Sequence, residues 1–427
     1  MRPIIRNFLS VIRRFKPAVA LNILGLSVAF AAFMVIMIQL NYDFGFDKFH
    51  KDYDKIFRVE FVQKTNTQAV ISHPLAERFF ESSPDIIAGA LTYSWKSTAS
   101  FHVEVDGVLN FYEEKSLTVS PEFFDVFTFN FVEGSNKGYM APGSIFIPLS
   151  LSRKLFGNEP AVGKQIIHNS LEPQTVMAVY RDLPANSIFD NYIYFAMPEN
   201  DPQANWRNSN RTAYIRVNDP SKVPLLFENF KQIFDFATIR GKTWDESDAF
   251  LRFTALPDIH FVTDVGWDDT PKASKQTLLI LLAIAIVIVV IAGINFINFS
   301  TALTPMRIKN INTQRVLGAR RSTLCLSIAS EAVVVSILSF CLAILIFMLF
   351  GNSPLSKLVD GDFSLAANSL IIGRTAVVAL IVGVVAGLYP AFYITSFAPA
   401  LVLKGSFGLS PKGKKIRNTL IGIQYMD

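Results

Sequence analysis

Five histidines are the first residues of this sequence to test for chemistry, because histidine is a common metal ligand and general base. They are His50, His73, His102, His168 and His260, and they are scattered, with no His-x-x-x-His pair, no cysteine partner and no carboxylate at a recognised metal spacing. No Gly-x-Ser-x-Gly nucleophile motif occurs. We expect surface or core histidines, no metal site, no cofactor and no enzymatic activity.

The segment GNEPAVGKQ, from Gly157 to Gln165, suggests a phosphate-binding loop at first sight. A Walker A motif needs four residues between its glycines and a Ser or Thr after its lysine. Here five residues separate Gly157 from Gly163, and Gln165 follows Lys164. A glycine-rich turn after the helical pattern LSRKLF is the better interpretation, so we expect no ATPase site in this chain.

A single acid, Glu331, lies about ten residues into the apolar run Ser322–Gly351, where exposure to lipid is costly enough to turn it toward protein. In a functional role it would be a charge partner for a nearby basic loop or a proton carrier. In a structural role it would hydrogen-bond a neighbouring helix or lie near the membrane interface. We favour the structural interpretation of this intramembrane acid, because the basic loop is close by.

The elements that carry these residues are those of a membrane protein. The chain has 427 residues, of which 51% are apolar and 18% charged, and its mean hydropathy is +0.33. Both cysteines lie in one apolar run, so the fold cannot depend on disulfides. Four runs reach the ~20 residues that a spanning helix needs. They are Ala18–Leu40, Thr277–Thr304, Ser322–Gly351 and Thr375–Phe397.

Basic residues alternate with these runs and predict the topology. Segments 1–17, 303–322 and 398–427 hold fifteen basic residues against one acid, Asp427. The positive-inside rule places all three segments in the cytoplasm, since inserting one arginine or lysine at mid-membrane costs roughly 2.5–3.5 kcal/mol. The region between the first two runs then lies outside the cytoplasm.

That outer region, Asn41–Gln276, holds 31 acids and 23 bases and has the size of two subdomains. Strand patterns such as YDKIFRVEFV, SFHVEV and QTVMAVY mix with helical patterns such as HPLAERFFES. The segment PLLFENFKQIFDFA has apolar residues at helical spacing, which predicts a packed face. Its members are Leu225, Phe227, Phe230, Ile233 and Phe234. The predicted fold is an α-helical membrane protein with four transmembrane helices and a large α+β extracytoplasmic domain between helices 1 and 2.

The stretch RIKNINTQRVLGARR, residues 307–321, joins the second and third runs and carries five basic residues and no acid. Ile308, Ile311 and Val316 share one helical arc, but Arg315 lies inside that arc, so the amphipathicity is imperfect. The tripeptide Leu-Gly-Ala that follows would end such a helix before the third run begins.

Two roles are open for this stretch. It is either a solvated loop that sets topology, or a coupling element whose apolar residues enter a groove on a cytoplasmic partner protein while its arginines meet acids at the rim. The residues of the coupling role would be Arg307, Ile308, Ile311, Arg315, Val316, Leu317, Gly318, Arg320 and Arg321.

In the fourth run, GVVAGLYPA has Gly383 and Gly387 at G-x-x-x-G spacing, followed by Pro390. Small residues at that spacing permit close helix contact, and proline frees a carbonyl that a neighbour must satisfy. Packing within the chain and contact across a dimer are both open for this motif.

A short internal echo links the two ends of the chain. IRNFLSVI at Ile5 and IRNTLIGI at Ile416 both place a basic residue and an asparagine before an apolar run. We therefore expect the N-terminal half of a duplicated membrane protein, in which 405–427 is a cytoplasmic linker and the start of a truncated fifth helix.

Several of these stretches together resemble the FtsX/MacB-type permeases of ABC transporters. RNFLSVIRRFKPAVALNILGLSVA is similar to the family's first span, and FDKFHKDYDKIFRV to the segment outside it. LTVSPEFFDVFTFNFVEGS and IPLSLSRKLFGNEPAVGKQI resemble its periplasmic core domain. INFINFSTALTPMRIKNINTQRVLGARRSTL resembles the loop between its second and third spans, and AGLYPAFYITSFAPALVLKG the exit of its fourth.

The resemblance implies a division of the chain into four parts. Residues 1–40 would be the cytoplasmic N-terminus and helix 1, 41–275 a MacB-like periplasmic core domain, 276–404 an FtsX-like permease domain with three helices, and 405–427 the linker. The implied partners are a cytoplasmic ABC ATPase, a second permease copy or half in a dimer, membrane lipid and a periplasmic adaptor, with no nucleic acid. Helix motions would be transmitted to the outer domain, which favours the coupling role for residues 307–321.

The expected function is a permease subunit in the bacterial cytoplasmic (inner) membrane. It would export or extract an envelope substrate such as an antimicrobial peptide, an antibiotic or a lipoprotein. The alternative is a membrane-tethered signalling or scaffold protein that regulates a cell-wall enzyme without transport.

Overall fold

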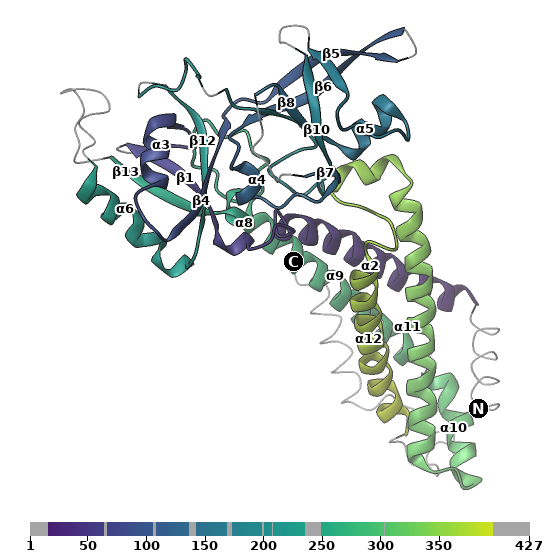
Figure 1. Cartoon of the computed structure of the whole chain (residues 1–427). Coiled ribbons are helices and arrows are strands. Elements are labelled where there is room, and N and C mark those ends of the chain that lie inside the picture. The colour runs from purple at the N-terminus through teal and green to yellow at the C-terminus, as the bar shows by residue number, and fades with distance from the viewer. Residues whose placement is uncertain are drawn as a thin grey trace. The chain divides into compact units, whose positions relative to one another are not determined.

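The computed structural model describes residues 16–63, 66–105, 108–135, 142–168, 173–198, 200–206, 208–234, 249–302 and 304–395. These residues form two compact units, whose elements are labelled in Figure 1. The helical unit comprises the described parts of Met1–Tyr42 and Lys275–Asp427, and the sheet unit those of Asp43–Ser274. The internal echo and the expected start of a fifth helix lie outside the described residues.

Among the described residues, four helices are long and apolar enough to cross a membrane, judged by length and composition. They are α2 (Lys16–Phe44), α9 (Lys275–Ala302), α11 (Arg321–Gly351) and α12 (Ser369–Thr395). The shorter α10 (Thr304–Val316) precedes α11, and η4 (Pro354–Leu358) follows it. The long helices extend past the predicted runs, as α12 does when it begins before Arg374, because hydropathy marks only the stretch suited to hydrocarbon.

One apolar core joins the four long helices. Its buried members are Leu26, Phe30, Ala31, Met34, Ile38, Phe296, Ala332, Ala343, Phe347, Ile371, Ala379 and Ala386. Alanines are frequent in this core, and small side chains let helix backbones approach closely. The helices expose branched aliphatic side chains on their other faces, as Ile286, Leu338 and Ile381 do, which suits an apolar solvent.

The described strands of the sheet unit form one thirteen-stranded mixed sheet. They are β1 (Ile56–Gln63), β2 (Asn66–Gln68), β3 (Ile71–Ser72), β4 (Ile86–Tyr93), β5 (Ser97–Val105), β6 (Val108–Val119), β7 (Phe131–Gly134), β8 (Ser144–Pro148), β9 (Gln165–His168), β10 (Gln174–Tyr180), β11 (Ile193–Ala196), β12 (Ser209–Val217) and β13 (Ala249–Ala255). The main path runs β11-β8-β10-β9-β5-β6-β4-β12-β1-β13. Because β11 also pairs with β6, the first part of this path closes into a ring.

Short helices cover two separate cores of this sheet. One core lies among β1, β4, β12 and β13 with α3 (His73–Phe80) and α6 (Val223–Ile233). The other fills the closed ring with α5 (Leu149–Phe156). The strands β4 and β6 join the two parts through the residue pair Thr92 and Val119. The remaining short elements are η1 (Tyr53–Lys55), α4 (Phe123–Val126), η2 (Pro220–Lys222) and α8 (Leu256–Ile259).

The predicted strand and helix patterns of the outer region are confirmed, but the packed face of α6 is partly wrong. Phe227 and Phe230 are buried as expected, whereas Leu225 and Ile233 are exposed. The buried face of the helix instead includes Val223 and Leu226. Positions 223, 226, 227 and 230 follow the i, i+3, i+4, i+7 rule, whereas residue 225 points to the opposite side.

Buried charged residues fix the segment that precedes α9 in the sequence. Arg58 on β1 is fully buried and pairs with Glu60 at 2.6 Å and with Asp268 at 2.7 Å. Arg252 on β13 also pairs with Glu60, and Lys272 with Asp268, each at 2.6 Å. A buried charge without its partner is costly, so this network holds the segment around Asp268 on β1.

Candidate functional site

The expected coupling stretch folds as α10 followed by a tight turn into α11. Ala319 N donates to Gln314 O, and Gly318 N donates to Arg315 O, both at 3.0 Å. Gly318 has a φ of +95°, which favours glycine. These bonds and this φ define a Schellman motif, so the predicted end of the helix is confirmed.

Ile308 and Ile311 form the buried face of α10. They pack against side chains of α11 and α12, namely Leu324, Ile328, Ala391 and Ile394. Arg315 lies on the same face, where its Nη1 donates to the carbonyl of Thr395 at 3.2 Å. This bond explains why an arginine interrupts the apolar arc. We expected Ile308 and Ile311 to enter a partner's groove, but the structure places them inside the helical unit.

The surface that remains at the turn is apolar and basic. Val316 is 62% exposed and Leu317 is 81% exposed. Arg320 and Arg321 follow and are also exposed, although Arg321 Nε still donates to the Thr395 hydroxyl at 3.4 Å. We call Val316, Leu317, Arg320 and Arg321 the turn surface. The side chain of Arg307 lies outside the described part of the chain.

The arginines of the turn surface do not stabilise the helix that they precede. Arg320 occupies the N-cap of α11 and makes no side-chain cap hydrogen bond there. A positive charge at a helix N-terminus opposes the macrodipole, an effect of roughly 0.3–1 kcal/mol. Their position therefore suits a topology signal or an acidic partner, the two roles that the sequence left open.

The G-x-x-x-G motif of α12 packs against α11 of the same chain. A Cβ on Gly387 would lie 2.7 Å from the Cβ of Ala332, and one on Gly383 would lie 3.0 Å from the Cβ of Ser336. Ser336 Oγ also donates to the carbonyl of Ala379 at 2.7 Å across this seam. Both glycines therefore face α11 closely, which leaves no room at them for a helix of a second copy.

Two further predicted residues lie in the same pair of helices. Pro390 is buried inside α12, where it removes the amide that would bond the carbonyl of Ala386. Glu331 is buried in α11, one turn after Ile328, so this acid faces protein as expected. Its role as a charge partner or a structural group stays a prediction.

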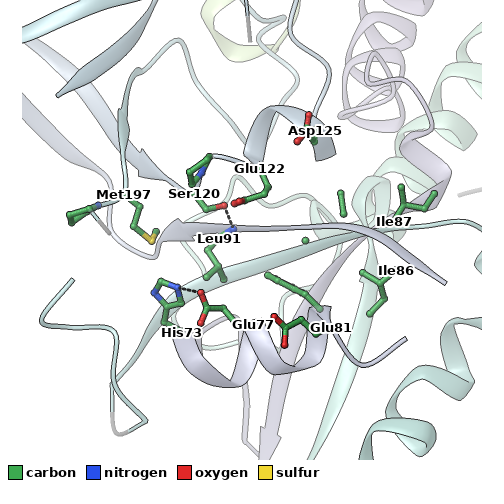
Figure 2. Close-up of a pocket in the computed structure, with 15 residues that line it drawn as sticks. His73, Glu77, Glu81, Ile86, Ile87, Leu91, Ser120, Glu122, Asp125 and Met197 are labelled. Carbon is green, nitrogen blue, oxygen red and sulfur yellow. Dashed lines mark hydrogen bonds and ion pairs between the residues drawn. The ribbon is translucent and has the colours of Figure 1, made fainter. Parts of the chain in front are cut away.

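A groove with a volume of about 680 Å³ lies in the sheet unit, lined by α3, β4 and the segment around α4 (Figure 2). Its lining includes the apolar side chains of Phe80 and Leu91. The ring of Phe80 lies directly over Gly89, where any Cβ would overlap with it. Ser120 Oγ accepts a hydrogen bond from the Leu91 amide at 3.1 Å and so joins the two sides.

The charged residues of this groove are acids. Figure 2 shows Glu77 on α3, Glu81 just after the end of α3 and, across β4, Glu122 and Asp125. Among the described lining residues there is no lysine or arginine. The groove therefore favours cationic groups over anions. No sequence pattern indicates this groove, because its two sides come from segments that are distant along the chain.

Four of the five histidines have described side chains, and these lie apart. His50 is buried, and this burial lowers its pKa to about 3. His73 bonds one acid of the groove at 3.0 Å, and His102 lies on β5. His260 is buried with both ring nitrogens in contact with oxygen atoms. Among the described residues no group of three acids, cysteines or histidines is arranged to hold a metal ion.

The segment Gly157–Gln165 is a turn, as predicted. Gly157 follows α5 with a φ of +63°, and Gly163 has a φ of +86°. Lys164 pairs with Glu159 at 2.6 Å, so the lysine bonds an acid of its own turn.

Two known families match this chain in succession. The MacB-like periplasmic core domain matches residues 19–233, about half of the chain. The C-terminal domain of FtsX-like permeases matches residues 282–399.

The chain is also similar to individual proteins. It is 26% identical over 321 residues to the macrolide export ATP-binding/permease protein MacB of Bdellovibrio bacteriovorus, a match that covers 74% of this chain and 45% of that protein. The chain thus spans less than half the length of this relative. A domain of a Porphyromonas gingivalis protein described as a permease is 18% identical, with a TM-score of 0.40, 54% of this chain covered and 99% of that one. The periplasmic region of MacB from Actinobacillus actinomycetemcomitans is 14% identical, with a TM-score of 0.30, 45% of this chain covered and 87% of that one.

Proposed function

This chain belongs to the FtsX/MacB-like permease family, and we propose that it is the permease subunit of an ABC transporter. In this proposal a cytoplasmic ABC ATPase binds the turn surface, and its ATP hydrolysis drives movements of the sheet unit by mechanotransmission. The chain acts with a second permease copy or half in the bacterial inner membrane. Residues 41–275 are its periplasmic core domain and 276–404 its permease domain.

The observation that carries this proposal is the anchoring of α10. One face of this helix is buried against α11 and α12 through Ile308 and Ile311. The tip of the same helix exposes Val316 and Leu317 beside two arginines. A partner that covers this tip would gain apolar contact at the centre and charge complementarity at the rim. Force applied there would pass directly into two long helices.

The groove of the sheet unit bears on the substrate. Its four carboxylates and its apolar residues favour a ligand that carries both positive charge and apolar groups. Among the candidate cargoes, this supports a cationic peptide or a basic antibiotic over an anionic molecule. A lipoprotein would have to present basic residues to use the same groove.

A second function, regulation of a cell-wall enzyme without transport, uses the same ATPase contact. The two functions differ in what stimulates ATP turnover. A transporter's partner ATPase hydrolyses faster when cargo is present, whereas a regulator's ATPase responds to the enzyme that it controls. Measuring ATP turnover of the complex with and without cationic peptide separates the two.

The test of the coupling role is copurification with the cognate ATPase from native membranes. Replacing both Val316 and Leu317 with Asp puts unpaired charge into the proposed contact, which costs several kcal/mol when a charge is buried alone. Leu358→Asp is the matched control, because Leu358 is 79% exposed on η4, in the other loop of the helical unit. We expect the ATPase to be lost with the first variant and retained with the control.

The arginines give an independent arm of this test. Arg320→Gln with Arg321→Gln should weaken recovery of the ATPase at high salt and less at low salt, because rim charges act through screened electrostatics. Membrane insertion is checked separately for every variant. Equal recovery of the ATPase with wild type and the Val316/Leu317 variant would remove the coupling role and leave a topology signal.

A further inference from the structure

Two chain segments connect the sheet unit to its flanking long helices, namely the last turn of α2 and the residues just before α9. Within the sheet unit, one side chain contacts both segments. His260 Nε2 lies 2.9 Å from Asp43 Oδ1, at the end of α2. His260 Nδ1 lies 2.8 Å from the carbonyl of Pro271, which precedes α9. We call Asp43, His260 and Pro271 the junction clasp.

Neighbouring contacts hold His260 in this position. The ring of Phe46 stacks on the imidazole, with centroids 3.8 Å apart and an interplanar angle of 7°. The carbonyl of His260 accepts a hydrogen bond from Ala273 N at 2.9 Å. Lys272 Nζ donates to the carbonyl of Ile259 at 2.7 Å. The short piece of chain at the end of α8, Ile259 and His260, therefore bonds both connecting segments.

The two hydrogen bonds of the clasp each need a proton. A neutral histidine and an ionised aspartate carry only one such proton between them, so the clasp requires one more. A carbonyl only accepts hydrogen bonds, so Nδ1 must carry a proton to bond Pro271. The bond between Nε2 and Asp43 needs a second proton, carried either by the ring or by the carboxyl group. Without it, the lone pair of Nε2 would face a carboxylate in a buried site, which is unfavourable.

Three other titratable groups near the ring, Asp47, His50 and Lys272, have hydrogen-bond or charge partners of their own. Asp47, three residues after the end of α2, is buried, and this burial raises its pKa to about 7, although hydrogen bonds from Ser187 and Ile188 and the charge of His260 oppose the shift. His50 lies beside Asp47 and is kept neutral by burial, which lowers its pKa to about 3. The charge of Lys272 is paired with Asp268 at 2.6 Å. The hydrogen bonds of the ring itself are therefore those to Asp43 and Pro271.

We propose that His260 is a positioning residue that ties the two connections of the sheet unit to each other while the clasp holds its extra proton. When that proton leaves, the bond to Asp43 or the bond to Pro271 is lost. His260 then no longer hydrogen-bonds both segments at once. The clasp stands without the proposed function, and only its role in transmitting helix motion rests on that proposal.

Asp43→Asn is the informative variant. An asparagine amide donates to a neutral Nε2 while Nδ1–H still donates to Pro271, so both bonds persist without the extra proton. His260→Leu removes both bonds and keeps an apolar side chain that can pack against Phe46. His73→Leu is the matched control, because His73 also pairs with an acid but lies on α3.

The measurement is hydrogen exchange by mass spectrometry on the whole chain in lipid nanodiscs, with no ATPase present. Protection factors are followed from pH 5.5 to 9 in peptides that cover residues 41–50 and 268–275, with a β10 peptide as internal reference. For wild type we expect protection in both junction peptides to fall about tenfold or more as pH rises, relative to β10, as for loss of a hydrogen bond to a charged group. For Asp43→Asn we expect no such fall in the 268–275 peptide, whereas the 41–50 peptide should keep the part of the fall that comes from ionisation of buried Asp47.

His260→Leu should lower protection in both junction peptides at every pH, and His73→Leu in neither. A wild-type profile of the 268–275 peptide that is flat with pH, or an equal fall of this peptide in Asp43→Asn, would overturn the proton dependence. Loss of protection in only one peptide with His260→Leu would overturn the tie between the segments. If His260→Leu does not fold, the comparison of wild type with Asp43→Asn still decides. None of these outcomes bears on ATPase binding, so the two proposals fail separately.

Discussion

Replacing Gly387 with alanine gives a direct test of the α11–α12 seam. The added Cβ would lie 2.7 Å from the Cβ of Ala332 and 3.1 Å from both the Cα and the carbonyl oxygen of Ala329. Carbon atoms pack best at about 3.5–4.0 Å, so the two helices must separate by about 1 Å. Overpacking of this kind costs roughly 1–3 kcal/mol, whereas alanine recovers at most about 1 kcal/mol of helix propensity. We expect a net loss of about 1–2 kcal/mol.

The assay is the apparent melting temperature of the whole chain in detergent, followed by the helical circular dichroism signal. A loss of this size should lower the transition of the helical unit by about 2–8 °C, taking 2–4 °C per kcal/mol for a unit of this size. Gly373→Ala is the control on the same helix, because a Cβ there meets nothing within 4 Å. Adding Ala332→Gly to Gly387→Ala removes the closest atom and should restore part of the loss.

The result that would refute this reasoning is equal melting of the Gly387→Ala and Gly373→Ala variants. Light scattering on the same samples addresses the alternative role of the motif in a dimer. A change in oligomeric mass without a change in melting temperature would mean that Gly387 contacts a second copy rather than α11.

Two further predictions concern buried charge in the sheet unit. Burial raises the pKa of Asp47 from 3.8 to about 7, so its contribution to the free energy of unfolding is fully present below 3.8 and is lost as pH rises through 7. Asp47→Asn should therefore raise the melting temperature of the whole chain more at pH 8 than at pH 5, and equal shifts would contradict this. Arg58→Met removes the buried partner of Glu60 and Asp268, and should cost about 3–5 kcal/mol in denaturant unfolding, against at most ~1 kcal/mol for Lys164→Met at an exposed pair. Similar losses for these two variants would show that the network around Arg58 is not a buried one.

The sequence predicted the features that depend on neighbouring residues. The four apolar runs correspond to long helices, because a single segment of about twenty apolar residues can pair all its backbone polar groups in lipid only as a helix. The end of α10 was predictable because a glycine after a helical pattern favours a positive φ, which Gly318 adopts. The strand patterns were predictable from alternation and β-branched content, as at Gln174–Tyr180.

Features that depend on long-range pairing could not be predicted. His260 bonds Asp43 across 217 positions of the sequence, and no local pattern indicates which acid a histidine will meet. The groove combines α3 with the segment around α4 only after β4 has paired with β12. On α10, helical periodicity placed Val316 on the same face as Ile308, whereas only Ile308 of the two is buried. A helical wheel shows which residues share a face, but it does not show which part of that face a neighbouring helix covers.

The buried face of α10 bears on the choice between coupling and topology. A loop that only sets topology needs its charges on the cytoplasmic side, and the positive-inside rule counts those charges whatever the loop's shape. It needs no packed helix. Here Ile308 and Ile311 are buried, and burial of each side chain stabilises the packed position by roughly 1.5–3 kcal/mol. The guanidinium of Arg315 donates a hydrogen bond to the carbonyl of Thr395. These contacts fix α10 to α11 and α12 as one body, so a displacement of Leu317 would move two long helices rather than bend a loop. Rigidity of this kind is what a coupling element requires, and a topology signal gains nothing from it.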